Sequence, residues 1–229
     1  MKKIFFLISL SLILNFSLSA QTMSFGVSEI IVKEGFEDDL IKAHDVALES
    51  VKFLNGAQII IERLNKQKNN EATHRIIWLI PLGEEWFEGG NEDKGQAFWA
   101  KYGNMVETTN QYSGRILSWQ EGDGLEENRD IHIWDYVPEN PQQFKVGHDK
   151  IVKKFKDDLN GRVVGFGTYD LHRPDNATHW VAVSGKNHED HMMLYDKLQG
   201  NSEFTKLIAE RGNARAVKDY TVEILKVYQ

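Results

Sequence analysis

The chain has 229 residues, with 34 acidic and 27 basic side chains, a formal net charge of −7 and no cysteine. This acidic balance argues against nucleic acid as a general partner, because phosphate contacts require clustered Lys and Arg, and it argues equally against an anionic membrane surface. The absence of cysteine excludes disulfides, thiol catalysis and iron–sulfur ligation, so the core alone must stabilise the fold, and 41% hydrophobic residues can supply that core.

Residues 1–20 have the layout of a secretory signal peptide. Two lysines precede an apolar run over 4–14, and Ala20 offers a small residue for cleavage. The run is short for a membrane span, which favours cleavage over the alternative of an uncleaved N-terminal anchor. We therefore expect a secreted or periplasmic protein with no membrane association after cleavage. Its net charge would be 25 minus 34, or −9, because the first 20 residues contain two lysines and no acid.

Strand and helix patterns alternate along the first half of the remaining chain. Runs rich in Ile and Val predict strands, and apolar residues spaced three and four apart predict helices. Asn55-Gly56 is expected to end the first helix, since glycine accepts the left-handed cap conformation. The predicted elements are a strand over 25–33, a helix over 36–54, strands over 57–64 and 73–80, a helix over 96–111 and a strand over 115–120.

An acidic, glycine-containing stretch over 123–130 is predicted to be a linker, because such residues mark irregular segments. The same order of elements then returns. The predicted elements are a strand over 131–137, a helix over 144–159, strands over 162–169 and 178–183, helices over 188–198 and 203–211, and a strand over 220–228. Both halves have the order β-α-β-β-α-β, which is the ferredoxin-like unit.

Three short motifs occur twice in the same order. His-Asp, Leu-Asn-Gly and Ala-Thr-His begin at positions 44, 54 and 72 and again at 148, 159 and 177, which gives offsets of 104, 105 and 105 residues. Three matches at nearly one offset indicate the duplication and fusion of a single unit. We predict a first ferredoxin-like repeat over 21–122 and a second over 131–229.

Two fused units of this kind resemble the dimeric α+β barrel superfamily. The resemblance rests on element order and duplication, and it covers nearly all of the chain after residue 20. Members include antibiotic-biosynthesis-monooxygenase-like proteins, stress-responsive barrels and, as tandem copies, chlorite-dismutase-like haem proteins. The resemblance implies an α+β fold in which two four-stranded sheets close a pseudo-dimeric barrel with helices outside. It includes no family-specific catalytic motif, so it transfers an architecture and a loose functional expectation.

Four repeated histidines are the candidate catalytic residues. His44 and His148 fall within the apolar stripes of their helices, and His74 and His179 open the third strand of each repeat. Histidine titrates near neutral pH and binds metals through its neutral nitrogen, so these residues suit a general base or a ligand. The alternative is that they are hydrogen-bonded packing residues. We predict that the two histidines of each repeat lie close together, but no metal site is assigned, because a third ligand is missing.

Aromatic side chains are the candidate ligand-binding residues. Trp86 and Phe87 lie in a loop that is longer than its counterpart in the second repeat, and long loops with aromatic residues often act as lids. The other candidates are Trp78 and Trp180, on the third strands, and Tyr169, on the second strand of the second repeat.

One further histidine pair occurs in the second repeat alone. His188 and His191 are three residues apart, so a helix would place them on one face. A solvated helix start is the favoured interpretation, because acidic residues lie between them and acids favour a first turn. Residues that are unique to one repeat are nevertheless of interest, since an active site usually decays in one copy of a duplication.

The sequence leaves three functions open. The first is binding of a small-molecule ligand in a cavity between helix and sheet, with cofactor-free, monooxygenase-like catalysis in which a histidine acts as the base. The second is haem binding with His148 as the axial ligand, so haem is the one cofactor that we consider. The third is a non-catalytic structural or interaction role. The pseudo-dimer can stand alone or pair again as a homodimer.

Overall fold

The structure is a computed structural model that describes residues 22–65, 71–123 and 127–229. Its first half has the expected β-α-β-β-α-β order with one extra pair of short strands, β2 and β5. The elements are β1 (Met23–Val32), α1 (Glu37–Leu48), β2 (Val51–Phe53), β3 (Gln58–Leu64), β4 (His74–Pro81), β5 (Phe87–Gly89), α2 (Glu92–Met105) and β6 (Val106–Gln120).

The second half repeats this order, with its second helical segment split in two. The elements are β7 (Asp130–Pro138), α3 (Pro141–Lys154), β8 (Val164–Leu171), the single-turn helix η1 (Pro174–Asn176), β9 (His179–Gly185), α4 (His188–Gln199), α5 (Ser202–Arg211) and β10 (Ala214–Tyr228). The split into α4 and α5 agrees with the two helical segments that the sequence predicts.

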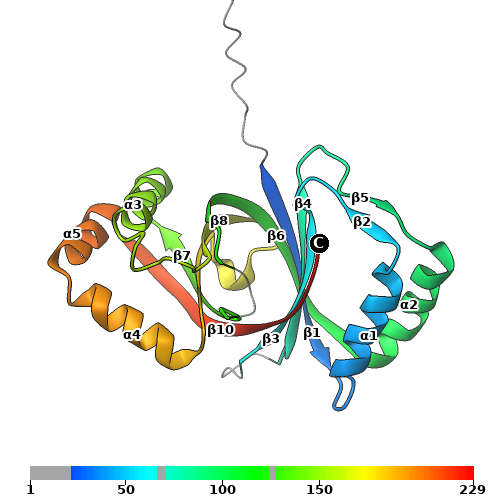
Figure 1. The fold of residues 1–229 in the computed structure, drawn as a ribbon. Coiled ribbons are helices and arrows are strands. Elements are labelled where there is room, and N and C mark those ends of the chain that lie inside the picture. Colours follow the sequence, from blue (N-terminus) through cyan, green and yellow to red (C-terminus); the bar gives the residue numbers. More distant parts are fainter. Residues whose placement is uncertain (1–21, 66–70, 124–126) are drawn as a thin grey trace, which may run out of the picture.

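The strands form one closed barrel in the order β1-β4-β3-β10-β7-β9-β8-β6. Each half contributes four strands to this barrel, and all the pairings are antiparallel. The helices of the two halves lie outside the barrel on opposite sides (Figure 1). The protein is therefore the α+β pseudo-dimer of two fused ferredoxin-like units that the sequence predicts.

The two long strands β6 and β10 join the halves. Each has 15 residues, and each pairs with the first strand of its own half and with the second strand of the other half. The register shifts within each long strand, between Ile116 and Ser118 in β6 and between Ile224 and Lys226 in β10. Bulges of this kind bend a strand, which lets it follow the closing curve of the barrel.

The first helix is shorter than predicted. α1 ends at Leu48, and Val51–Phe53 pair with β5 as a strand, so the predicted helix over 36–54 is wrong in its last turns. Asn55 and Gly56 have positive φ angles of 53° and 76°. They turn the chain between β2 and β3 and do not cap a helix.

The fourth strand of each half is longer than predicted. β6 begins at Val106 and β10 at Ala214, so the predicted strands over 115–120 and 220–228 miss their first parts. The predicted helix over 96–111 is correspondingly wrong at its end. The missed segment of β6 is largely exposed and polar, so backbone pairing with β1 specifies it without an apolar alternation.

The repeated Ala-Thr-His motif has the same structural role in both halves. The backbone N–H of Thr73 donates to the carbonyl of Ile30 (2.9 Å), and that of Thr178 donates to the carbonyl of Tyr136 (3.0 Å). Each threonine hydroxyl lies 2.8 Å from Nδ1 of the histidine that follows it. The motif thus ties the start of the third strand to the first strand, which gives a structural reason for its repetition.

The barrel interior is mainly apolar, but a polar network crosses it. Arg75 donates to Glu62 (Nε to Oε2, 2.9 Å) and to the hydroxyl of Tyr220 (2.7 Å), and the hydroxyl of Tyr169 donates to Asp135 (2.7 Å). All five residues are buried. Burial of a charge is costly unless it is paired and hydrogen-bonded, so these contacts restrict how the two sheets can face each other.

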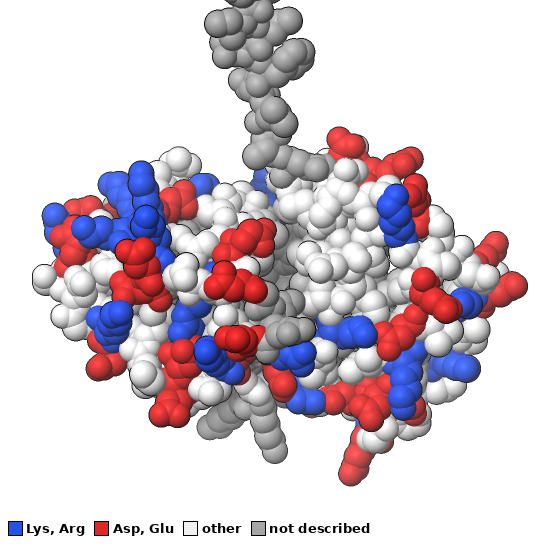
Figure 2. All heavy atoms as spheres, in the orientation of Figure 1, with Lys and Arg blue, Asp and Glu red and all other residues white. Residues whose placement is uncertain are grey.

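On the face of the molecule that Figure 2 shows, acidic and basic side chains are mixed and concentrate over the helices and the lower rim. Charges of both signs lie side by side, so this face offers no continuous basic surface of the kind that nucleic acid requires. Within the part of the chain that the structure describes, no helix has both the length and the apolar character that a membrane crossing needs.

Burial raises the pKa of the Asp135 carboxyl from 3.8 to about 6, against the opposing effects of the Tyr169 hydrogen bond and the Arg75 charge. A carboxyl group whose pKa is higher in the folded state than in the unfolded state makes its full contribution to stability at pH values below the unfolded-state pKa. That contribution is lost as the pH rises through the folded-state pKa. Asp135 therefore makes the protein less stable at pH 8 than at pH 4.

Asp135→Asn should remove this loss, because the amide oxygen still accepts from Tyr169 but cannot ionise. We expect the unfolding free energy of the variant minus that of wild type to be about 2 kcal/mol larger at pH 8 than at pH 4, so the variant is relatively more stable at pH 8. Urea titrations at both pH values measure it, and the exposed Asp157→Asn is the matched control. A difference that does not change with pH would contradict the prediction.

Candidate functional site

An open groove lies outside the barrel in each half. The helix groove, of about 440 Å³, runs between α1 and α2. The histidine groove, of about 310 Å³, lies where α4 meets the outer faces of β7 and β10. The histidine groove is lined by Asn65, His132, His188, His191, Met192, Tyr195, Asp219, Tyr220 and Thr221.

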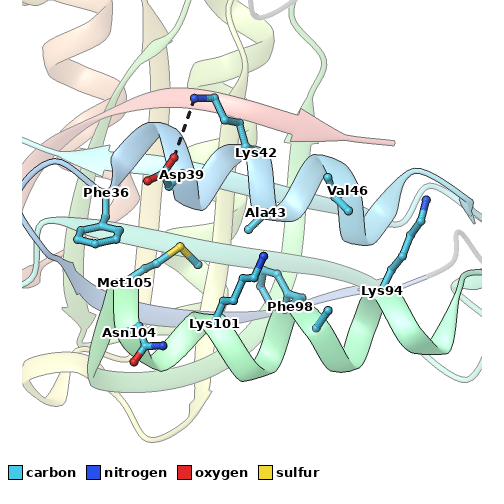
Figure 3. Close-up of a pocket in the computed structure, with 11 residues that line it drawn as sticks. Phe36, Asp39, Lys42, Ala43, Val46, Lys94, Phe98, Lys101, Asn104 and Met105 are labelled. Carbon is cyan, nitrogen blue, oxygen red and sulfur yellow. Dashed lines mark ion pairs between the residues drawn. The ribbon is translucent and has the colours of Figure 1, made fainter.

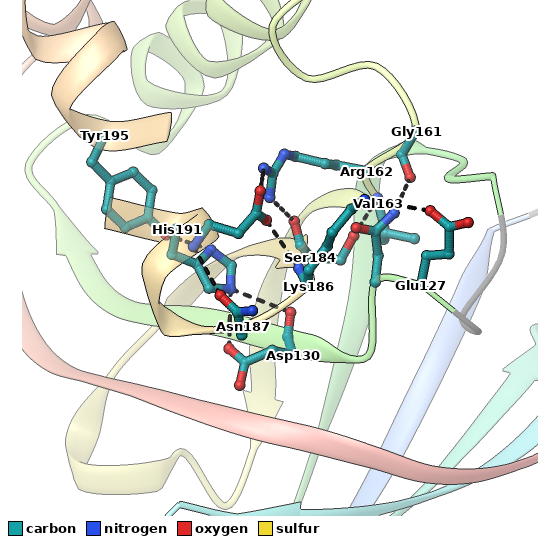
Figure 4. Close-up of polar contacts among 12 residues, drawn as sticks. Glu127, Asp130, Gly161, Arg162, Val163, Ser184, Lys186, Asn187, His191 and Tyr195 are labelled. Atoms are coloured by element: carbon teal, nitrogen blue, oxygen red, sulfur yellow. Dashed lines mark hydrogen bonds and ion pairs between the residues drawn. The ribbon is translucent and has the colours of Figure 1, made fainter. Parts of the chain in front are cut away.

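A chain of hydrogen bonds runs along the histidine groove. Nδ1 of His132 lies 2.8 Å from the hydroxyl of Tyr195, and that hydroxyl lies 3.2 Å from Nδ1 of His191. Nε2 of His191 lies 3.3 Å from the carbonyl oxygen of Asp130 and 3.1 Å from its carboxylate. At the other end, Nε2 of His132 is 3.7 Å from the carboxylate of Asp219. Figure 4 shows the part of the chain around His191.

The hydrogen-bond partners determine which ring nitrogen of each histidine carries a hydrogen. The backbone carbonyl of Asp130, which is the hydrogen-bond partner of Nε2 of His191, can only accept, so Nε2 carries the hydrogen. That tautomer leaves Nδ1 of His191 bare, and Nδ1 accepts the single hydroxyl hydrogen of Tyr195. The Tyr195 oxygen accepts in turn from Nδ1 of His132, and a neutral His132 is left with a bare Nε2. The arrangement therefore presents a basic nitrogen at the Asp219 end of the groove.

The electrostatic environment keeps these groups in the required forms. Burial lowers the pKa of His132, and the neighbouring His191 lowers it further. Burial also raises the pKa of the Tyr195 hydroxyl. At neutral pH His132 is thus available as a base, and Tyr195 stays protonated and able to connect the two histidines.

Local structure fixes α4 against the sheet. The side chain of Asn187 caps the helix by accepting from the N–H of Asp190 (3.0 Å). Asp190 accepts from Arg162 (2.7 Å), whose guanidinium also donates to the carbonyl of Ser184 (2.8 Å) (Figure 4). A Cβ atom at Gly185 would lie only 2.8 Å from the His191 ring, so this position requires glycine. The imidazole of His191 is therefore held at a set place beside β7.

Side chains along β7 alternate between the outer and inner faces of the barrel, and this alternation places His132 in the groove. His132 and Trp134 face outward and stack with ring centroids 3.9 Å apart, while the intervening Ile133 belongs to the barrel core. His132 and Asp130 are not among the residues that the sequence singled out. Their spacing of two within a strand is the signal that could have found them. The sequence drew attention to His191 because it occurs in one repeat only, but the favoured interpretation of a solvated helix start is wrong for this residue, whose side chain is buried.

The candidate histidines of the first half have separate partners. Nδ1 of His44 lies 2.8 Å from the carbonyl oxygen of Leu40, and its ring packs on Phe98 with centroids 4.7 Å apart. Nε2 of His74 lies 2.7 Å from the carboxylate of Glu37. Both imidazoles are buried, and each hydrogen bond gives its histidine a packing role.

The candidate histidines of the second half share one aromatic neighbour. The ring of Phe166, on β8, lies 5.1 Å from that of His148 and 5.7 Å from that of His179, centroid to centroid. Among the described residues, the buried Nε2 of His148 has no hydrogen-bond partner. Burial lowers the pKa of His148 to about 4, so the imidazole is neutral at physiological pH.

The candidate aromatic residues lie at several separate places. Trp180 and Tyr169 are in the barrel interior, and Trp78 packs in the core between the first sheet and its helices. Trp86 and Phe87 pack edge to face with centroids 4.5 Å apart on the outer β2–β5 pair, and Phe87 is 44% exposed. The structure does not gather these five side chains around one cavity.

Within residues 22–65, 71–123 and 127–229, no group of three or more His, Cys, Asp or Glu side chains is arranged to hold a metal ion.

No protein-family model matches the chain, and no curated protein matches it in sequence. Its fold is similar to an anthrone oxidase-like protein (TM-score 0.54, 10% identity, 92% of this chain and 94% of the other). It is also similar to a monooxygenase candidate from Lactobacillus acidophilus NCFM, with a TM-score of 0.56 and 12% identity over 91% of this chain and 97% of the other. A third similar structure is a haem-binding protein from Thermus thermophilus, with a TM-score of 0.51 and 7% identity over 90% of this chain and 92% of the other. At these identities the likeness shows the fold alone.

Replacing His148 should make the protein less sensitive to acid. The pKa of His148 is about 4 in the folded state and 6.5 in the unfolded chain. The protein therefore loses stability as the pH falls below 6.5, because the unfolded state takes up the proton first. We expect the unfolding free energy of His148→Gln minus that of wild type to be about 2 kcal/mol larger at pH 4.5 than at pH 7.5, so the variant is relatively more stable in acid. Urea unfolding measures this difference, with the exposed His188→Gln as the control. Equal pH responses of His148→Gln and wild type would refute it.

Proposed function

We propose that this protein binds a small organic molecule in the histidine groove and acts on it by acid–base chemistry, with His132 as the general base. The observation that carries the proposal is the hydrogen-bond chain from Asp130 to His132. Nε2 of His191 is hydrogen-bonded to the backbone carbonyl of Asp130, and the Asp130 carboxylate lies 3.1 Å away. Fixed hydrogen bonds of this kind are what protein catalysts use to hold an imidazole in its basic tautomer.

The groove also favours the charged form of His132 once it has taken a proton. The new N–H at Nε2 would face the carboxylate of Asp219, 3.7 Å away. Nδ1 of His132 keeps its hydrogen and its hydrogen bond to Tyr195, so no other group in the hydrogen-bond chain has to move. Asp219 is exposed, which limits the strength of this pair because solvent screens it, and it also lets the carboxylate adjust to a ligand.

For the reaction class we propose cofactor-free oxygenation of a carbon acid. The names of two similar structures, an anthrone oxidase-like protein and a monooxygenase candidate, suggest this chemistry. His132 would remove a proton from a methylene group that is conjugated with a ketone through aromatic rings, as in anthrone. The resulting carbanion transfers one electron to O2, the two radicals combine, and the returned proton gives a hydroperoxide. Loss of water then leaves a second ketone, so that CH2 and O2 become C=O and H2O.

Haem binding is the second function that the sequence left open. An imidazole nitrogen without a hydrogen-bond partner, such as Nε2 of His148, is the donor that haem iron takes. The surroundings do not fit the group, however. The fully buried ring of Phe166 lies 5.1 Å from that of His148 and 5.7 Å from that of Phe144, centroid to centroid. Gly147 brings α3 into close contact with Arg211 on α5. A haem at His148 would require α3 and α5 to separate, so no step is assigned to it.

The proposal includes the export that residues 1–20 predict, which would place the enzyme in the periplasm or outside the cell. It also allows the barrel to act either as a monomer or as a homodimer, because the groove is built from one chain.

Oxidation of anthrone to anthraquinone, followed by absorbance and by O2 consumption, tests the proposal. We expect wild type to catalyse the reaction and His132→Gln to lower kcat by about 100-fold, the typical contribution of a positioned base. Tyr195→Phe should lower kcat while it leaves the fold intact, because His132 loses the partner that sets its tautomer. His172→Asn, at an exposed histidine outside the groove, is the matched control.

The pH profile adds a readout that a structural role would not affect. The rate should fall as the pH drops through the lowered pKa of His132, since the protonated imidazole cannot accept. Wild-type rates in His132→Gln, with an unchanged profile, would overturn the assignment of the base. Absence of turnover in wild type would overturn the proposed reaction class.

A further inference from the structure

The helix groove exists because the two halves pack their helices differently. In the second half, a Cβ atom at Gly147 of α3 would lie only 2.5 Å from Cα of Arg211, so glycine allows α5 to lie directly against α3. The Arg211 guanidinium covers the ring of Phe144, 4.3 Å from its centroid. The second half thus fills the space between its helices with its own cation and aromatic ring.

The first half lacks both features. Ala43 stands where the His-Asp motif alignment places Gly147, one residue before the repeated histidine. Gly103 and Arg211 both lie three residues before the start of the fourth strand. A Cβ atom at Gly103 would meet no group within 4 Å, and Gly103 is not a lining residue of the groove, so this position does not fill the space between α1 and α2. The helices α1 and α2 therefore enclose the open helix groove of about 440 Å³.

The lining of the helix groove is amphipathic. Its floor is apolar and includes Ala43, Val46, Phe98 and Met105. In Figure 3, Lys101 extends from α2 across the groove toward α1. Among the described residues, its ammonium has no ion-pair or hydrogen-bond partner.

The other cations of the helix groove are already paired. Lys42 lies 4.0 Å from Asp39, and Lys94 forms an ion pair with Glu49. Within the described part of the chain, Lys101 is thus the one lining lysine that is available for a ligand, on a protein whose overall charge is negative. An apolar floor with a single available cation matches an anion with an apolar tail.

We propose that the helix groove is a binding site for amphiphilic carboxylates, with the tail on the apolar floor between α1 and α2 and the carboxylate on Lys101. The site is separate from the histidine groove, which lies in the other half of the molecule. It does not depend on the acid–base function proposed there.

Titration of the whole mature protein with octanoate, by calorimetry and by amide chemical-shift mapping, tests this site. We expect one octanoate per chain, with shifts confined to α1 and α2, and weaker binding of octan-1-ol, which has the same tail without the charge. Lys101→Glu should weaken octanoate binding by about fivefold, as expected for a partly exposed ion pair, and Lys101→Arg should retain it. The exposed Lys156→Glu is the matched control for net charge.

A second variant tests the shape of the groove. Ala97→Phe adds an aromatic ring at a residue that lines the groove, so the new side chain should occupy the groove and compete with both ligands, while the circular dichroism spectrum stays that of wild type. Equal affinities for octanoate and octan-1-ol, no effect of Lys101→Glu, or shifts around His132 would each overturn the proposal. A stable dimer in sedimentation velocity that Ala97→Phe dissociates would also overturn it, because a second copy would then cover the groove.

Discussion

The backbone pairings of β6 with β8 and of β10 with β3 are the constraint on which the rest of the structure depends. Without them each half would be a four-stranded sheet with two open edges and one uncovered face, a form that aggregates readily. Closure also brings together interior groups from different halves, such as Arg75 and Tyr220. The two grooves described above both lie outside the barrel, beside the helices.

Duplication explains which residues repeat and which do not. The repeated Ala-Thr-His and Leu-Asn-Gly motifs anchor strands and turns, and both halves need these. The chemical groups of the histidine groove occur in one half. Ile30 pairs with His74 and Tyr136 with His179, so β1 and β7 align with Gly26 at the position of His132. The first half therefore lacks the base, and it instead has a groove between its helices that the second half fills with Arg211.

Sequence patterns predicted the fold well because strong periodicity and duplication reflect burial. Strands such as β4, apolar on both faces, could be assigned from residue type alone. The first parts of β6 and β10 could not, since their side chains are polar and exposed and only pairing with distant strands makes them regular. The β2–β5 pair was missed because its strands are short. Its three residues per strand carry too little pattern to compete with the helical stripe that precedes them.

The candidate site was harder to predict than the fold. Repetition drew attention to His44, His74, His148 and His179, and the hydrogen bonds of the first two give them packing roles. His132 occurs in one copy and sits within an ordinary alternating strand, so only its contact with Tyr195, 63 residues away in the sequence, distinguishes it. Contacts of this range come from topology, and no local spacing encodes them.

The tautomer of His132 is the most direct test of the central claim that a hydrogen-bond chain anchored at Asp130 presents a base to the groove. Long-range ¹H–¹⁵N correlation spectra at pH 7.5, on protein labelled at histidine, report the protonation of each ring nitrogen. The structure predicts His132 with its hydrogen on Nδ1 and His191 with its hydrogen on Nε2, and a mixture of tautomers at His132 in Tyr195→Phe. A wild-type His132 with its hydrogen on Nε2, or one that Tyr195→Phe leaves unchanged, would contradict it.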